Sequence, residues 1–528
     1  MVARRLSTDS LRTVCVVLGL GMLPGTVLAQ NPGPLSAIDW LQTRGGVEMP
    51  GAYPITPPVA SSVGGSTGIS VRALDALRPE AVGLYPAARV GLPAALWGTT
   101  PARALSDLIA DLPADMLPSL RELSLRLLLA EFNAPLPGTE PSPVPDFLLT
   151  RIDKLIEFGA LDQAAAVLDT LDSDAPVLRL RRFDIGLLLG DEHTACQPVL
   201  REEPPVGDAA ALIFCMARAG QWQEASALLD AAAEENRVAP YLAELLQHFL
   251  DGDETLPGAS TLLPPPPGTP DPLTWRLREA VGDGLPTLGL PVSYAHADLR
   301  GTQGWRAQIE AAERLVRAGA LSPNRLLGLY TERRAAASGG IWERVRVVQR
   351  LDTALRNADA AATSAALIEA WPQIQAGELE VPMASLYAQP LGQIGLTGEA
   401  RAIAYRIGLL SEAYETVALG LPAGADAEER FLAAVARGLD PAQAGAMPGE
   451  LAAAVTQAFG PEPPLPDGMA ERLAEGRLGE EMLRILMQLG GPGDPRVLAE
   501  GLGGLRALGL EDIARRTALE SLLLERRG

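Results

Sequence analysis

The chain has 528 residues, a formal net charge of −21 and only 4 % aromatic residues. A surface of this charge repels nucleic acid and anionic lipid head groups, so we expect neither as a main partner. Because sheets are rich in β-branched and aromatic side chains, the scarcity of aromatic residues beside abundant Ala and Leu favours helices.

The first 29 residues have the pattern of a cleavable signal peptide. Basic residues precede an apolar run at 14–23, which is much shorter than the roughly 20 residues of a membrane-spanning helix. Val27 and Ala29 place small side chains before a cleavage site between Ala29 and Gln30. We therefore expect a mature chain that is periplasmic or secreted, with no transmembrane segment after cleavage. An uncleaved N-terminal anchor is the alternative.

Residues 30–100 are rich in Pro, Gly and Ser and are expected to form a largely disordered leader. One apolar island interrupts this leader, where Ser36 could cap a short helix that carries Ile38, Trp40 and Leu41. These three residues are a candidate docking segment for another protein. The alternative is that they pack against the chain's own helical part.

From residue 101 onwards, apolar residues recur at helical spacing, and glycine is repeatedly followed five residues later by alanine. A glycine just past a helix can adopt the left-handed conformation that ends the helix. The alanine then lies one turn into the next helix, where its small side chain lets two helices approach closely. The pattern predicts helix–turn–helix units, each with an apolar side that the next unit must cover. The pairs are Gly159/Ala164, Gly190/Ala195, Gly220/Ala225, Gly395/Ala400 and Gly509/Ala514.

The segment from Gly220 to Leu229 resembles the second-helix half of a tetratricopeptide repeat, and the segment from Gly159 to Leu168 is similar. The glycine, the Trp222 or Leu161 two residues later, the alanine and the large residue at the end all fit that family. The period is nearer 30 than the family's 34 residues, and the first-helix Trp and Leu-Gly residues are missing. We expect Trp222 and Leu161 to fill the corner between the two helices of a unit.

The predicted fold is all-α, an α-solenoid of tetratricopeptide-like repeats that follows the disordered leader. A helical repeat region covers residues 101–263, and a second helical region with degenerate repeats covers 273–528. Between them, the proline-rich stretch 264–272 can be neither a helix nor a central strand and is expected to be a stiff linker. Whether the two regions form one continuous solenoid or two bodies stays open.

Two cysteines, Cys196 and Cys215, remain after signal cleavage and lie in predicted neighbouring helices. In an oxidising compartment an even number of cysteines suggests a disulfide, with two buried free thiols as the alternative. With 18 residues between the cysteines, the bridge would connect adjacent repeats and stabilise the fold by about 3 kcal/mol.

No catalytic or metal-binding pattern is evident, so no catalytic residue, metal or cofactor is predicted. The three histidines, His193, His248 and His296, match no zinc or triad motif and are expected on the surface or in loops. Glu520-Ser521 and Leu486-Met487-Gln488 are similar to fragments of the lytic transglycosylase active site. Their order along the chain is reversed and no lysozyme-like domain surrounds them, so we reject that match.

One stretch, between residues 328 and 344, is a candidate protein-binding surface because it joins aromatic residues and arginines around a loop of small residues. Arginine and large aromatic residues dominate the binding energy of protein interfaces. The alternative is an ordinary turn with Trp342 in the core and Arg333 and Arg334 paired with nearby acids. The candidate residues are Tyr330, Arg333, Arg334, Trp342 and Arg344.

The whole pattern also resembles exported bacterial proteins of unknown role that are sometimes labelled antifreeze glycopeptide-related. That label implies no activity here, because the Ala-Ala-Thr at residues 361–363 is not repeated. We expect a non-enzymatic scaffold or adaptor that binds a protein or peptide of the cell envelope through its helical repeats. A cell-wall or polysaccharide enzyme with an unrecognised site, or a structural or solute-binding envelope protein, are the alternatives.

Overall fold

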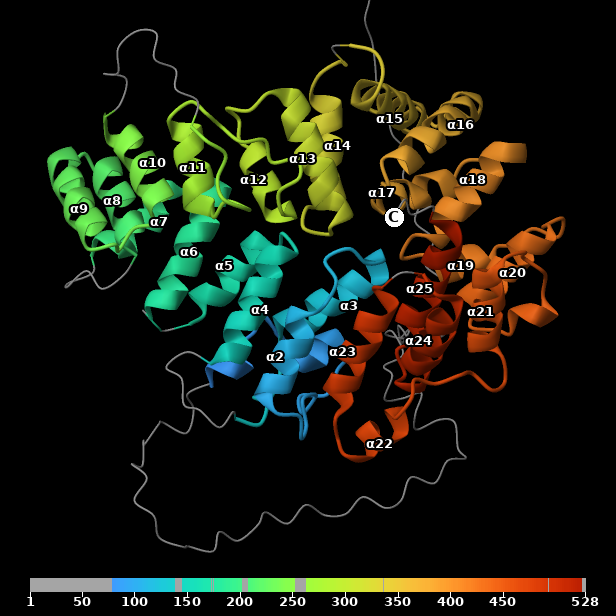
Figure 1. Ribbon diagram of the computed structural model, residues 1–528. Helices are drawn as coiled ribbons and strands as arrows, with labels where there is room; N and C mark the ends of the chain where they lie inside the picture. The colour runs from blue at the N-terminus through green and yellow to red at the C-terminus, as the bar shows by residue number, and fades with distance from the viewer. Residues whose placement is uncertain are drawn as a thin grey trace, which may run out of the picture. The chain divides into compact units, whose positions relative to one another are not determined.

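The computed structural model describes residues 78–524, except 138–144, 172, 174, 202–207, 252–262, 336 and 492. The predicted signal peptide, most of the leader, and Ile38, Trp40 and Leu41 lie outside the described residues. Within them the fold is all-α, as predicted, with helices α2 to α25 and one short parallel pair of strands (Figure 1). No helix of the described part combines the length and apolar character that spanning a membrane requires. The strands are β1 (Tyr85–Pro86) and β2 (Ala130–Glu131).

The packed part of the chain begins earlier than the sequence predicts. Residues 78–100 were expected to belong to the disordered leader, but Leu96 and Trp97 are buried in the core. The Trp97 ring packs edge-on against Phe132 and Phe147, with ring centroids 5.4 and 5.5 Å apart. The predicted boundary at residue 100 is therefore wrong, because the prolines and glycines of this stretch lie in turns between buried side chains. Two 3-10 helices occur here, η1 (Pro79–Ala81) and η2 (Ala87–Val90).

The first helices form the predicted hairpins. Gly159, Gly190 and Gly220 have φ values of 75°, 81° and 83°, and each follows one helix and precedes another. The helices of the second hairpin approach so closely that a Cβ added to Gly186 would lie 2.5 Å from the Cβ of Ala195. The small residues therefore allow the contact that the repeat pattern predicted. The helices are α2 (Ala102–Ala110), α3 (Pro118–Leu129), α4 (Asp146–Glu157), α5 (Leu161–Asp169), α6 (Pro176–Leu189), α7 (Glu192–Leu200), α8 (Ala209–Arg218), α9 (Trp222–Glu234) and α10 (Pro240–Asp251).

The residue two positions after the glycine fills the hairpin corner in only one of the two copies. Leu161 is fully buried, whereas Trp222 is 48 % exposed. The Trp222 ring lies against Phe249 of α10, with centroids 6.0 Å apart, so it is covered only in part. The expectation is correct for Leu161 and wrong for Trp222.

The proline-rich stretch 264–272 contains no helix before Pro272, but it does not separate two bodies. The carbonyl of Pro264 accepts hydrogen bonds from Tyr241 and Arg278, and the carbonyl of Pro270 accepts one from Tyr294. Helix α11 (Pro272–Ala280), which follows, packs against both α6 and α10. All the described residues belong to one compact unit.

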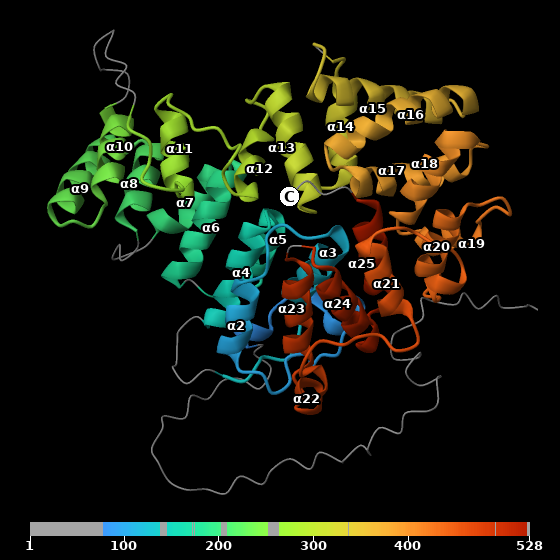
Figure 2. The same ribbon diagram turned by 45° about the vertical axis from the view of Figure 1, so that its right-hand side comes forward.

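Consecutive helices continue to pack side by side through the middle of the chain (Figure 2). Helices α13 and α14 form one antiparallel pair, and α15 and α16 form another. Helix α18 then contacts both α16 and α17. The elements are η4 (Val292–Tyr294), α12 (Ala295–Asp298), α13 (Trp305–Arg317), α14 (Pro323–Glu332), α15 (Ile341–Arg356), α16 (Ala360–Ala376), α17 (Glu380–Gly392) and α18 (Gly398–Leu409).

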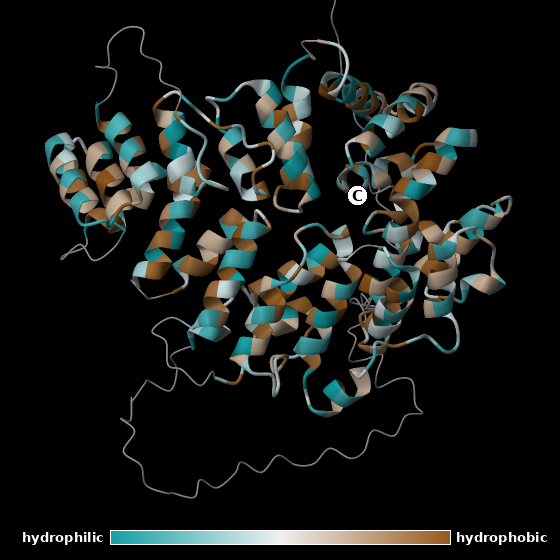
Figure 3. Ribbon diagram, in the orientation of Figure 1, coloured by the Kyte–Doolittle hydropathy of each residue, from teal (hydrophilic) through white to brown (hydrophobic). Residues whose placement is uncertain are grey.

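The last helices of the chain return to the first ones. Helix α25 packs on α3, and α23 packs on both α2 and α3. These ends share the largest hydrophobic core, which joins Leu96 and Leu120 to Leu483 and Ile513. The ribbons of α2, α3, α23 and α24 carry many apolar residues (brown in Figure 3). The helices are α19 (Tyr414–Leu419), α20 (Ala427–Ala436), α21 (Glu450–Phe459), α22 (Met469–Ala474), α23 (Leu478–Leu489), α24 (Pro495–Ala507) and α25 (Glu511–Leu523), and η5 (Pro441–Gln443) follows α20.

A buried carboxylate connects these two ends. Ser119, in the first turn of α3, donates its backbone N–H and its hydroxyl to Oε2 of Glu520 on α25, at 3.0 and 2.7 Å. The Glu520 side chain therefore caps the positive end of α3. Next to it, Glu122 of α3 and Arg516 of α25 form an ion pair of 2.7 Å. Burial raises the pKa of Glu122, but Arg516 and Arg126 outweigh that effect and hold its pKa below the ordinary value.

One type of turn recurs along the whole described chain. Its central residue has a φ between 52° and 83°, and the next helix starts two residues later. The residue after this central residue donates its backbone N–H to the carbonyl oxygen five positions earlier, for example from Ala160 to Leu155. This hydrogen bond is typical of a Schellman helix end. The residue five positions after the centre is at most 8 % exposed. The central residues are Gly159, Gly190, Gly220, Ala358, Glu378, Gly476 and Gly509, and the buried residues are Ala164, Ala195, Ala225, Thr363, Met383, Glu481 and Ala514.

The later copies depart from the predicted residue types. Ala358 and Glu378 take the place of the glycine at two turns, both with a φ of 52°. The predicted pair Gly395/Ala400 does not form such a turn, because the positive φ of that region belongs to Gly398, the first residue of α18. Some of the expected helical hairpins are therefore present and others are not. The tetratricopeptide type of repeat stays a prediction.

This turn generates a prediction with a matched control. Ala358 is exposed and has a left-handed backbone that strains any residue with a Cβ. Ala358→Gly should therefore raise the free energy of unfolding by about 0.5–1 kcal/mol. Gly220→Ala, where an added Cβ would contact nothing within 4 Å, should lower it by about 1 kcal/mol. Urea unfolding followed by circular dichroism measures both, and a destabilised Ala358→Gly would contradict the prediction.

Candidate functional site

Two of the five residues predicted as a binding surface are in the interior. Tyr330 is fully buried, and its hydroxyl donates to Oε1 of Glu313 at 2.6 Å. Arg344 donates from Nε and a terminal nitrogen to both carboxylate oxygens of Glu313, at 2.8 and 2.6 Å. Burial, reinforced by the Glu313 charge, raises the pKa of Tyr330 well above its ordinary value. The prediction is wrong for Tyr330 and Arg344, because a buried acid 17 and 31 residues away uses their polar atoms to join α13, α14 and α15.

The other three residues lie at the border of this core. Trp342 is half-buried, and its ring lies 5.0 Å from that of Trp305. Arg333 is exposed and pairs with Glu332 at 2.9 Å. Arg334 is exposed and forms no ion pair within the described part of the chain. The ordinary-turn alternative thus fits Trp342 and Arg333, and only the two arginines are available to a partner.

A groove of about 460 Å³ between α15 and α16 lies beside the backbone of Arg333. Gln349, which lines the groove, donates its amide to the carbonyls of Tyr330 and Arg333, at 2.7 and 2.6 Å. Arg350 of α15 pairs with Glu369 of α16 across the hairpin. The groove therefore combines small side chains with two arginines and two acidic residues, Asp359 and Glu369. Its lining includes Arg346, Gln349, Arg350, Asn357, Ala362 and Ala366.

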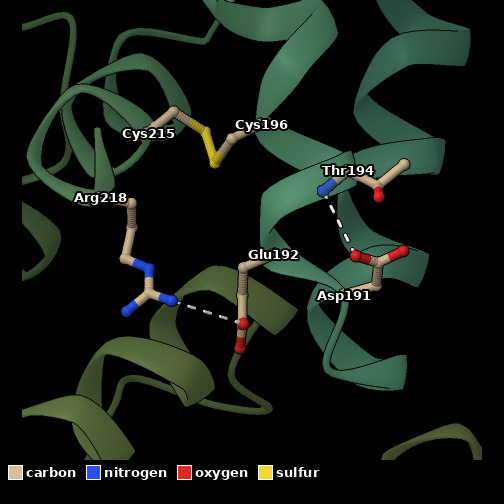
Figure 4. The surroundings of a disulfide bond; sticks show 6 residues. All are labelled: Asp191, Glu192, Thr194, Cys196, Cys215 and Arg218. Carbon is tan, nitrogen blue, oxygen red and sulfur yellow. Dashed lines mark hydrogen bonds and ion pairs between the residues drawn. A yellow bond between two sulfur atoms is a disulfide. The ribbon is translucent and has the colours of Figure 1, made fainter.

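The predicted disulfide joins the second and third hairpins. Cys196 of α7 and Cys215 of α8 are bonded through their sulfur atoms, with Cα atoms 5.2 Å apart (Figure 4). Glu192, at the start of α7, pairs with Arg218 of α8 at 3.8 Å and with Arg276 of α11 at 2.6 Å. A covalent bond and an ion-pair network thus tie the same helices together. Both cysteines are buried.

A cavity of about 300 Å³ lies between α4, α6 and the start of α11. Asp184 faces it and accepts no hydrogen bond from the described residues. Burial raises the pKa of Asp184 to about 7, and the nearby carboxylates of Asp271, Asp208 and Asp153 add to the effect against the opposing charge of Arg181. The Arg181 guanidinium is already paired with Asp153, at 2.5 and 3.0 Å. Asp184 is therefore a poorly compensated carboxyl group.

A larger pocket of about 500 Å³ lies where the first and last helices meet. It brings together Gln488 and Glu520-Ser521, the fragments noted in the sequence, but the Glu520 carboxylate is held by Ser119 as a helix cap. No pattern in the sequence indicates this pocket. The residues that line it are scattered between positions 115 and 524, and the lining is largely apolar. The apolar lining includes Met116, Leu117, Leu489, Val497, Leu498 and Leu524.

The histidines do not form a site. His296 is buried, contrary to expectation, and its Nε2 donates to the carbonyl of Gly159 at 2.7 Å. Burial lowers the pKa of His296, although the Gly159 carbonyl opposes the shift. Within the described ranges, no cluster of three or more His, Cys, Asp or Glu could hold a metal ion.

Known proteins provide no assignment for these features. No protein-family model, no curated protein and no solved structure matches the chain. A function must therefore be argued from the geometry of the grooves, pockets and charged groups.

The Asp184 cavity predicts a dependence of stability on pH. The pKa is about 7 in the folded state and about 3.9 in an unfolded chain, so the folded state binds the additional proton. Stability should accordingly fall as the pH rises from about 4 to above 7. Asp184→Asn should remove this loss, raising the free energy of unfolding at pH 8 by up to roughly 4 kcal/mol and changing little at pH 4.

Thermal unfolding from pH 4 to pH 8 checks this prediction. Asp153→Asn is the matched control in the same cavity, because it removes a carboxylate that Arg181 compensates. This control should gain less stability at pH 8 than Asp184→Asn, because it breaks the Arg181 ion pair while it removes one of the charges that raise the Asp184 pKa. A lower unfolding midpoint for Asp184→Asn at pH 8 would contradict the prediction.

The disulfide predicts a loss of stability on reduction. Replacing both Cys196 and Cys215 by Ser should lower the free energy of unfolding by about 3 kcal/mol, because the unfolded chain gains the freedom of an open loop. Helical content should persist, since the surrounding core is otherwise intact. Urea unfolding with and without dithiothreitol measures the effect. The reductant should destabilise the wild-type protein and leave the double variant unchanged, and equal stability of the wild type in both buffers would refute a stabilising bridge.

Proposed function

We propose that the protein is a non-enzymatic scaffold or adaptor of the periplasm that binds a protein or peptide of the cell envelope through its helical surface. The observation that carries the proposal is the α15–α16 groove, which lies beside Arg333 and just after the exposed Arg334 in the chain. The signal-peptide pattern and the Cys196–Cys215 bridge support an exported location, because such bridges persist in oxidising compartments.

The shape of the groove suits a chain segment better than a compact small molecule. Ala362, Ala365 and Ala366 lie along one wall and leave room for another backbone to approach. Arg346, Gln349 and Arg350 lie along the opposite wall within about one helical turn of each other. Grooves between helices are a recurrent way of binding peptide segments.

Arginines at the groove would suit an acidic partner segment. Arg346 and Arg350 line the groove together with Asp359 and Glu369, and Arg333 lies beside it, because Gln349 bonds its carbonyl. Arg346 and Arg350 have intramolecular partners, but their side chains are 41 % and 49 % exposed. Exposed ion pairs contribute little stability, so an incoming carboxylate can replace them at small cost. Complementary charge would also speed the encounter with such a partner.

A second candidate, an enzyme acting on cell wall or polysaccharide, is favoured by one observation. The 500 Å³ pocket brings Gln488, Glu520 and Ser521 together. Hydrolysis of peptidoglycan by the pure protein, lost in a folded Glu520→Gln variant, would establish this candidate. The Ser119–Glu520 hydrogen bonds weigh against it, because they give the carboxylate a structural role.

Photo-crosslinking in cells tests the proposed function. A photoreactive residue at position 334 should give a reproducible adduct with one envelope protein, because this exposed position directly follows Arg333, whose carbonyl is bonded by the groove residue Gln349. The same residue at position 103 is the control, since Arg103 is 77 % exposed on the distant helix α2.

Charge reversal then tests the groove itself. Arg346→Glu with Arg350→Glu should abolish the adduct at position 334 and weaken binding of the purified partner by at least about tenfold. No reproducible adduct at position 334, or an equal adduct at position 103, would refute the proposal.

A further inference from the structure

The cavity that Asp184 faces has no role in the proposed function. It measures about 300 Å³ and is lined by residues of α4, α6 and η4 and by the first residue of α11. Ligand sites commonly measure about 300–1,000 Å³, so this cavity has the size of a site for a small molecule. Its lining residue Glu157 is exposed and Asp153 is only half-buried. The cavity is therefore open to solvent on the side of α4.

Most of the cavity wall is apolar. The Tyr294 ring lines it from η4, while the Tyr294 hydroxyl donates to the carbonyl of Pro270. Burial raises the pKa of Tyr294 above its ordinary value, so this hydroxyl adds no charge at neutral pH. Such a wall suits an organic ligand better than a bare metal ion, which takes several oxygen ligands. The other apolar residues of the wall are Ile156, Ile185, Leu188, Pro272 and Pro291.

One polar group of the cavity lacks a hydrogen-bond partner. The Asp184 side chain is largely buried, and its carboxyl accepts no hydrogen bond from the described residues. The arginine of the lining, Arg181, donates instead to both carboxylate oxygens of Asp153, at 2.5 and 3.0 Å. The third acid of the lining, Glu157, pairs with Lys154 at 2.7 Å. Two of the three acids are thus paired with a cation, and Asp184 is the one whose oxygens are left for a ligand.

The charges around Asp184 are unbalanced. Asp153 acts on it from α4, Asp271 from the position before α11 and Asp208 from the position before α8, and each repels its negative charge. Arg181, one turn earlier on α6, attracts that charge, but burial and the three acids outweigh the attraction and raise the pKa of Asp184 to about 7. A cation in the cavity would therefore stabilise the ionised carboxylate, whereas an anion would be repelled.

We propose that this cavity binds a small primary amine, whose ammonium group pairs with the Asp184 carboxylate while its short alkyl chain lies against Ile185, Leu188 and Tyr294. The ammonium would supply the donors that no described residue gives to this carboxylate, and hydrogen bonds between charged groups are the strong ones. The site shares no residue with the α15–α16 groove. The proposed function and this proposal can therefore fail independently.

Binding should depend on pH, because the amine and a proton compete for the same carboxylate. With a pKa of about 7, Asp184 is about one-tenth ionised at pH 6 and about nine-tenths ionised at pH 8. An alkylammonium group, like that of lysine with a pKa of about 10.4, keeps its charge over this range. The affinity for the amine should accordingly rise about tenfold from pH 6 to pH 8.

Three probes that share one chain and differ in head group test the proposal. Butylammonium, butanol and butyrate are titrated against the full chain by ligand-observed NMR at low ionic strength. At pH 8 butylammonium should bind about fivefold or more tightly than either of the other two, and its affinity should fall towards pH 6. Equal affinity of the three probes, tighter binding of butyrate, or a butylammonium affinity that is the same at both pH values would overturn the proposal.

Two variants connect the preference to Asp184. Asp184→Asn should abolish the pH dependence and reduce the preference for butylammonium over butanol to about twofold or less. Because this variant is expected to be more stable than the wild type at pH 8, a loss of binding cannot come from unfolding. Glu157→Gln is the matched control, since it removes an exposed negative charge at the same cavity and should leave the affinity within about twofold.

The pair of variants also separates a site from general attraction to an acidic surface. General attraction would weaken equally when either carboxylate is removed, whereas pairing with Asp184 is lost in only one variant. Unfolding midpoints of both variants are measured at pH 6 and pH 8 in parallel. A preference for butylammonium that persists in Asp184→Asn, or an equal loss in both variants, would refute the assignment.

Discussion

The contact between Ser119 and Glu520 is the constraint on which the rest of the described structure depends. It places a carboxylate that is 3 % exposed at the positive end of α3, where a serine N–H and hydroxyl compensate its charge. Together with the nearby charge of Arg516, these donors offset the cost of burying a carboxylate, which would be strongly unfavourable for an isolated charge. Because the contact spans 401 residues, it joins the last helix of the described chain to one of the first, and the shared core and the pocket both lie beside it.

The recurring turn shows how much of the fold the sequence predicts and where prediction stops. The glycine–alanine spacing identifies the turns at Gly159, Gly190, Gly220 and Gly509, because glycine adopts a positive φ without strain. The glycine–alanine spacing misses the turn at Ala358, where the buried position is Thr363. A non-glycine residue can occupy such a turn because the left-handed conformation costs it only about 1–2 kcal/mol of strain. Packing of whole helices outweighs that cost, so the geometry is retained where the residue types are lost.

The candidate site was less predictable than the fold, and burial is the reason. Tyr330 and Arg344 have the chemistry of interface residues, but Glu313 satisfies both in the interior, and nothing local indicates a pairing over 17 and 31 residues. Arg333 and Arg334 were correctly placed on the surface because they lie in the turn that follows α14. The bridge between Cys196 and Cys215 was predictable for a different reason, since consecutive helices of a hairpin array are neighbours.

The distribution of charge connects these features. The backbone hydrogen bond of the turn and one buried residue define each hairpin, so the side chains on its outer faces can vary without changing the packing. On this common framework α15 and α16 place both arginines and carboxylates around a groove, whereas α3, α23, α24 and α25 meet at a larger pocket with several apolar side chains. The repeated turns and the Ser119–Glu520 cap therefore maintain the helices, while the side chains on their outer faces set the local charge.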